Sequence, residues 1–138
     1  MIQIAICDDD PIQLKQTSNI ILGLDLEYRL KIELFSDGEQ LISSIEDLDY
    51  RPDILLLDIV LPESSGIQVA ARINKLCPDC AVIYLTAFLS YATDVYETRH
   101  SYFIIKSQLK ERIGPALSKA ISGKVAPARL SFRESGTI

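Results

Sequence analysis

Residues 54–58 constrain the fold more than any other stretch of the sequence. They read Ile-Leu-Leu-Leu-Asp, an unbroken apolar run that ends abruptly in the carboxylate of Asp58. Such a run is typical of a strand that is buried on both faces of a parallel sheet. Packing gives no reason for a core strand to end in an acid. Because Pro62 and Gly66 predict a loop before the next helix, Asp58 falls at a strand-to-loop junction, where α/β sheets bind ligands.

Four further stretches predict strands, three of them apolar runs and one an alternating pattern, and helical patterns separate them. Strands are expected over residues 2–7, 31–35, 53–58, 81–85 and 102–105, and the alternation in the second predicts a half-exposed or edge strand. Helices are expected over 11–22, 38–45, 66–76, 90–99 and 109–121, with a kink or local break at Pro115. Right-handed crossovers then predict an α/β fold, a flavodoxin-like (βα)₅ doubly wound parallel sheet with strand order 2-1-3-4-5.

Composition excludes several classes of protein. The 138 residues, 48% of them hydrophobic, suffice for one domain with a core. The net charge of −5 argues against binding of nucleic acid by this part alone. No apolar run approaches the roughly 18 residues of a membrane span, and residues 1–6 look like a strand rather than a signal peptide. Three cysteines fit a reducing compartment, so we expect a cytoplasmic protein without membrane contact.

Polar side chains follow four of the expected strands. Asp8 and Asp9 follow the first, Asp58 ends the third, Thr86 follows the fourth and Lys106 follows the fifth. The carboxyl ends of parallel strands meet at one edge of a sheet, so these side chains are expected to converge. A carboxylate can act as a nucleophile toward phosphorus, while an ammonium and a hydroxyl can bind phosphoryl oxygens. Asp58 is therefore the candidate phosphoacceptor, and Thr86 and Lys106 are candidate phosphoryl-binding residues.

The acidic cluster also predicts a divalent cation. Three neighbouring carboxylates repel one another unless a cation lies between them. Mg²⁺ suits such a site because it takes one or two carboxylates and keeps positions for water and phosphate oxygens. The expected ligands are Asp8, Asp9, Asp58 and the main-chain carbonyl of Val60.

Together these residues resemble the receiver domain of two-component response regulators. The resemblance covers about residues 2–122 and rests on the following residues in the family's order: Asp8-Asp9, Asp58, Pro62, Gly66, Thr86-Ala87 and Lys106. It implies that a sensor histidine kinase phosphorylates Asp58 and that Asp9 is the main Mg²⁺ ligand. Thr86, Ala87 and Lys106 would bind the phosphoryl group. Thr86 and Phe103 would switch position upon phosphorylation, and the face formed by the fourth helix, fifth strand and fifth helix would change partners or form a homodimer.

The resemblance also extends to a subfamily. Residues 88–92 and 106–109 resemble receivers attached to LytTR-type DNA-binding domains, such as LytR-like and AgrA-like regulators. The expected organisation is a receiver domain over 1–123, followed over 124–138 by a linker and the start of a truncated output domain. Any DNA contact would then be made only through that C-terminal domain.

Two alternatives to a phosphorylated switch remain open at this point. A Mg²⁺-dependent phosphohydrolase with an aspartyl-phosphate intermediate typically has a second acid two residues after the nucleophile, whereas Val60 stands there. An unphosphorylated pseudo-receiver would act by protein contact alone, which the intact set of acids, Thr86 and Lys106 disfavours. We therefore expect a switch and not an enzyme. Val60 and Phe88 cannot orient water, so a long-lived phosphoryl form is expected, and Ser107 replaces the proline usual in the family.

Overall fold

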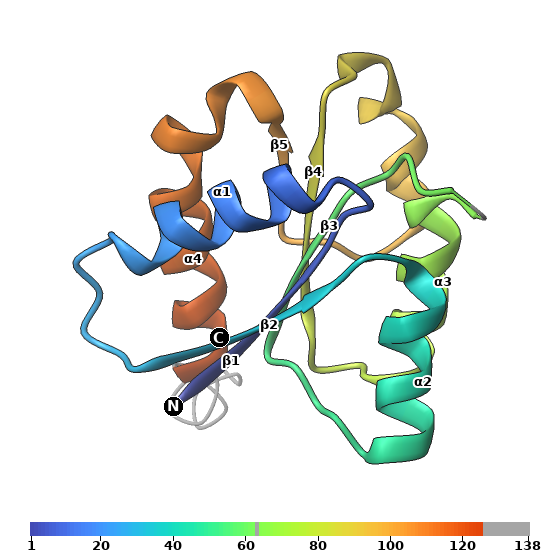
Figure 1. Cartoon of the computed structure of the whole chain (residues 1–138), viewed down its shortest axis with the longest axis horizontal. Coiled ribbons are helices and arrows are strands. Elements are labelled where there is room, and N and C mark those ends of the chain that lie inside the picture. The colour runs from blue at the N-terminus through green and yellow to red at the C-terminus, as the bar shows by residue number, and fades with distance from the viewer. Residues whose placement is uncertain (63, 126–138) are drawn as a thin grey trace, which may run out of the picture.

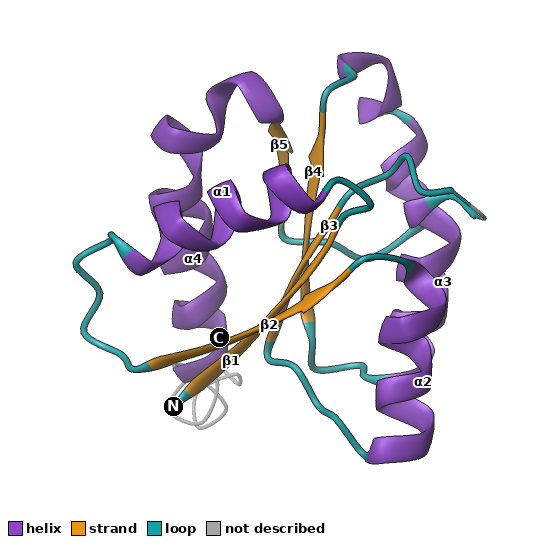
Figure 2. Cartoon of the chain, viewed as in Figure 1, coloured by secondary structure: helices purple, strands orange, loops and turns teal. Residues whose placement is uncertain are grey.

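A five-stranded parallel sheet forms the centre of the protein, and helices cover both of its faces (Figures 1 and 2). The computed structural model describes residues 1–62 and 64–125. The strands follow the order β2-β1-β3-β4-β5. This order confirms the predicted doubly wound fold and the edge position of the second strand. Their bounds are Ile2–Cys7 (β1), Leu30–Phe35 (β2), Ile54–Leu57 (β3), Ala81–Thr86 (β4) and Tyr102–Ile105 (β5).

The α-helices pack in pairs, α1 with α4 on one face of the sheet and α2 with α3 on the other (Figure 1). Polar N-caps precede three of them: the side chains of Asp10, Asp37 and Ser65 accept backbone N–H groups of the first turn. α4 continues through Pro115, so the local break expected there is not found. The bounds are Pro11–Leu22 (α1), Gly38–Leu48 (α2), Gly66–Leu76 (α3) and Leu109–Val125 (α4).

The prediction of a single helix over residues 90–99 is wrong. Two short 3₁₀ helices, η1 (Leu89–Ala92) and η2 (Asp94–Glu97), occupy the connection between β4 and β5. Val95 is the one buried residue of this connection in the described side chains, so a two-turn apolar stripe that would hold an α-helix against the sheet is missing. A third 3₁₀ helix, η3 (Lys106–Gln108), joins β5 to α4.

β3 divides the core into two layers. Leu55 and Leu57 belong to the layer under α2 and α3, whereas Ile54 and Leu56 belong to the layer under α1 and α4. All four side chains are fully buried, as expected for a strand covered on both faces. This burial fixes the position of β3 and therefore the position of Asp58, the residue that follows it.

Two of the sequence-based expectations concern the ends and the surroundings of the chain. No helix within residues 1–62 and 64–125 is long and apolar enough to cross a membrane. Of the segment 124–138, which is expected to hold a linker and the start of an output domain, residues 126–138 lie outside the described residues.

Candidate functional site

The carboxyl ends of the strands bring the predicted acids together. Asp58 donates its backbone N–H to the carbonyl oxygen of Cys7, which holds the end of β3 beside the end of β1. Carboxylate oxygens of Asp8, Asp9 and Asp58 lie within 4.8 Å of one another. In the described part of the chain, no other group of three histidine, cysteine or acidic side chains could hold a metal ion. The predicted acidic cluster therefore exists as one compact site.

Lys106 lies between two of these acids. Its Nζ is 2.9 Å from Asp58 Oδ2, to which it donates a hydrogen bond, and 2.9 Å from Asp8 Oδ2, with which it forms an ion pair. The lysine comes from the end of β5, beyond β4 in the sheet, so its side chain reaches across the strand ends to the acids. Ser107, in place of the family's usual proline, continues the chain into η3 and leaves this contact in place.

Burial shapes the charge balance of the site. Asp58 is only 6% exposed, and this burial, together with the nearby Asp8, raises the pKa of its carboxyl although Lys106 and the N–H of Val60 partly offset the rise. Burial alone would lower the pKa of Lys106, but its contacts with Asp8 and Asp58 outweigh burial and raise it. The lysine therefore stays charged between the two carboxylates.

The cluster suits a hard divalent cation. Three carboxylates and one ammonium leave a formal charge of −2, and all the side-chain donors facing the cluster are oxygens, the ligand type that Mg²⁺ prefers. Asp9 is exposed, so the cluster is open to solvent on its side. Val60 also lies beside Asp58, because its N–H donates to Asp58 Oδ1 at 3.1 Å. The ligand role of the Val60 carbonyl remains a prediction.

The predicted phosphoryl-binding and switch residues lie on β4 and β5. Thr86 is fully buried at the end of β4, and its Oγ1 accepts the backbone N–H of Phe88 at 3.4 Å. Ala87, the next residue, is exposed. Phe103 on β5 is half-buried and packs against the core layer under α2 and α3. Thr86 is thus engaged with the backbone rather than with the acids, and its movement together with Phe103 remains a prediction.

Gly66 has a positional role that the sequence reading missed. A Cβ atom at this residue would lie 2.1 Å from the carbonyl oxygen of Asp58 and 2.8 Å from the Cα of Ile59. Its N–H also donates to the Ile59 carbonyl at 2.7 Å. The first turn of α3 therefore presses directly on the backbone that carries the candidate phosphoacceptor, and only glycine fits there.

Ser65, which the sequence reading also missed, completes this arrangement and has a local signal. It forms a capping box with Gln68: Ser65 Oγ accepts backbone N–H from the first turn, and Gln68 Oε1 accepts the N–H of Ser65 at 3.4 Å. The pattern Ser-x-x-Gln is a local signal for such a box. The contact of Gly66 with Asp58, in contrast, joins two elements and has no local signal.

Comparisons with known proteins agree with this site. The family model described as "Response regulator receiver domain" matches residues 4–118. The positive alginate biosynthesis regulatory protein of Pseudomonas aeruginosa is 33% identical over 117 residues, which cover 85% of this chain and 46% of that protein. The sensory transduction protein LytR of Staphylococcus epidermidis is 30% identical over 120 residues, which cover 86% of this chain and 46% of that protein.

A solved structure also matches. The crystal structure of the response regulator TrrA from Thermotoga maritima, in complex with Mg²⁺-BeF, has a TM-score of 0.66 and 26% identity, and covers 84% of this chain and 99% of that one. The chain spans about half the length of the curated relatives it matches. The relatives named LytR and LytT support the LytTR-type assignment. With the acids and Lys106 at the strand ends and a family match over residues 4–118, the chain belongs to the response regulator receiver domain family.

Proposed function

We propose that this chain is a phosphoacceptor switch in which Asp58 receives a phosphoryl group from a sensor histidine kinase. A carboxylate oxygen of Asp58 attacks phosphorus, the phosphorus–nitrogen bond to the kinase histidine breaks, and an aspartyl phosphate forms. The observation that carries the proposal is the Lys106 ammonium 2.9 Å from Asp58 Oδ2. A positive charge at that distance is placed to neutralise phosphoryl oxygens during transfer.

Mg²⁺ is the proposed cofactor, and Asp8, Asp9, Asp58 and the Val60 carbonyl are its proposed ligands. The formal charge of −2 and the all-oxygen donor set support this choice, as does the Mg²⁺-BeF complex of the related TrrA. When bound, the ion would neutralise charge that develops on the phosphoryl oxygens. Lys106 would bind the same group from the side of β5.

The proposed switch follows from the state of Thr86. The Thr86 hydroxyl would move from the N–H of Phe88 to a phosphoryl oxygen, and the backbone of the exposed Ala87 would bind the same group. Phe103 would then pack into the space that Thr86 leaves. The surface that would respond consists of η1 and η2, which stand where the fourth helix was expected, together with β5 and α4, which is the expected fifth helix. Two copies of the chain could pair through this surface. In the same proposal residues 1–123 are the receiver domain, 124–138 are a linker with the start of an output domain, and DNA is contacted only through that domain.

Incubation with a small phosphodonor and Mg²⁺ tests the proposal. We expect one phosphoryl group per chain by intact mass, none in Asp58→Asn, and a normal adduct in Asp47→Asn, which changes an exposed acid of α2. Repeated turnover with release of phosphate would instead identify a phosphohydrolase. Absence of an adduct in the folded wild type, with and without a histidine kinase, would identify an interaction-only module.

A further inference from the structure

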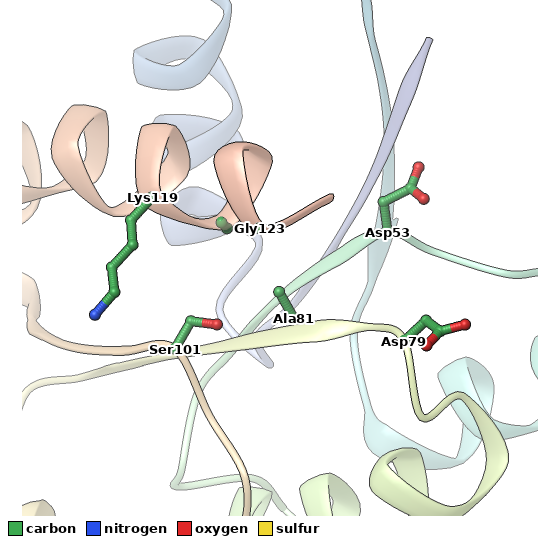
Figure 3. A pocket seen from close by; sticks show the side chains of 7 residues that line it. Asp53, Asp79, Ala81, Ser101, Lys119 and Gly123 are labelled. Carbon is green, nitrogen blue, oxygen red and sulfur yellow. The ribbon is translucent and has the colours of Figure 1, made fainter. Parts of the chain in front are cut away.

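A groove lies at the end of the sheet opposite Asp58. Its volume is about 620 Å³. The residues that line it include the charged Asp53, Asp79 and Lys119, and Gly123 near the end of α4. Asp53 precedes β3 and Asp58 follows it, so the groove and the phosphoacceptor lie at the two ends of one strand. Figure 3 shows Lys119 at one end of the groove, the two acids at the other and Gly123 between them.

The acidic end of this groove has unused capacity for a cation. Asp53 Oδ2 accepts the N–H of Gln3 at 2.8 Å, and Asp79 is exposed. Neither carboxylate forms an ion pair with another residue of 1–62 or 64–125. Within the described residues Lys119 forms no ion pair with either acid, and its Nζ lies 5.4 Å from the centre of the Tyr102 ring. The C-terminal end of α4 adds partial negative charge at Gly123.

The chain itself supplies a segment of matching chemistry. Residues 128–133 read Ala-Arg-Leu-Ser-Phe-Arg, in which Arg129 and Arg133 alternate with the apolar Leu130 and Phe132. In an extended conformation the arginines would share one face of the segment and the apolar side chains the other. Guanidinium groups bind carboxylates through paired hydrogen bonds, and the alanines in the groove wall offer apolar contact.

The tether favours this occupant over any other. α4 ends at Val125, and the four residues from there to Arg129 can span roughly 14 Å. Gly123, two residues before the end of α4, already lines the groove, so the segment starts at its edge. A short tether gives an effective concentration of the order of millimolar, at which weak contacts suffice for docking.

We propose that residues 128–133 dock into this groove, with Arg129 paired to Asp79, the carboxylate that is exposed there. The residues that directly follow the linker would then be held against the amino ends of β3 and β4, while the Asp58 site at the opposite end stays open. This docking is independent of phosphorylation chemistry, because none of its groups belongs to the acidic cluster at Asp58. It would set where any following domain starts relative to the sheet.

Hydrogen exchange of the backbone amides of 128–133 tests the docking in the 138-residue chain. We expect exchange at least tenfold slower than in an isolated peptide of the same sequence. Asp79→Lys and, separately, Arg129→Glu should return the rate to that of the peptide. The double variant should restore protection, whereas Asp47→Lys on α2 should leave it unchanged. Because Asp79 is exposed, these variants are expected to fold, which circular dichroism verifies.

Three results would overturn the proposal. The first is exchange of 128–133 at the peptide rate in the wild type. The second is protection that Asp79→Lys and Arg129→Glu leave intact, which would mean docking elsewhere. The third is protection of the groove residues that grows with protein concentration while 128–133 exchange freely, which would identify a second copy as the occupant.

Discussion

Replacing Gly66 with alanine should damage both the stability and the phosphorylation of this protein. The added Cβ would lie 2.1 Å from the Asp58 carbonyl oxygen and 2.8 Å from the Ile59 Cα, and both of these neighbours are backbone atoms. The first turn of α3 must therefore move away from the end of β3. Overpacking of this kind costs about 1–3 kcal/mol. Weakening of the 2.7 Å hydrogen bond from Gly66 to Ile59 adds about 1 kcal/mol.

The expected loss is thus about 2–4 kcal/mol in the free energy of unfolding, reduced slightly by the better helix propensity of alanine. Urea denaturation measures it. Gly114→Ala in α4 is the matched control, because the nearest atom to its Cβ would lie 3.9 Å away and the helix should gain up to about 1 kcal/mol. Phosphorylation of Asp58 by a small donor should be slower in Gly66→Ala even where the variant is folded. Equal stability and equal rates in the two variants would refute the reasoning.

Three further predictions concern other parts of the molecule. Burial raises the pKa of Asp58 in the folded state, so its negative charge lowers the free energy of unfolding as the pH rises above the ordinary pKa of an aspartate. Without Mg²⁺, Asp58→Asn should therefore unfold at higher urea than the wild type at pH 7, with a smaller difference at pH 4. Lower stability of Asp58→Asn at pH 7 would contradict this. Asn74 accepts the backbone N–H of Arg99 at 2.9 Å and donates to the Arg99 carbonyl at 3.2 Å. Asn74→Ala should therefore lower the free energy of unfolding by about 1–3 kcal/mol, measured by urea denaturation. No loss would show that other contacts hold the loop before β5. Val60 and Phe88 have apolar side chains that cannot orient a water molecule for hydrolysis, so the aspartyl phosphate should persist for minutes or longer. Phe88→Asn should shorten this lifetime. Loss of the phosphoryl label within seconds in the wild type would exclude this explanation.

The strands and most helices could be predicted because their signals are local. A four-residue apolar run must be buried on both faces, and alternation at residues 31–35 marks an edge. Asp10 and Asp37 start helices because their side chains accept backbone N–H groups a few residues ahead. The helix prediction for residues 90–99 was wrong because burial there depends on tertiary packing. Among the described side chains of this segment only Val95 is buried, and no local pattern states which surface it covers.

The acids that make up the candidate site could be named from the sequence alone. Their convergence follows from parallel topology, since strands that run in one direction end at one edge of the sheet. Asp8 and Asp9 come directly after the apolar run of residues 2–7, and Asp58 comes directly after the run of residues 54–57. Both runs are recognisable as strands from the sequence. The family resemblance then assigned roles to these residues, and the match over residues 4–118 confirmed the family.

Only the tertiary structure decided how the parts act on one another. The 2.9 Å contacts of Lys106 with Asp8 and Asp58 depend on side-chain reach across β4, and the contact of Gly66 with the Asp58 backbone depends on how α3 packs. The groove beside Asp53 likewise forms between elements far apart in the chain. The sequence determined which residues stand at the strand ends, because apolar runs and caps act within a few residues. Distances between those ends, the burial that raises the pKa of Asp58 and the groove arise only when the layers pack, since each joins residues that no local pattern relates.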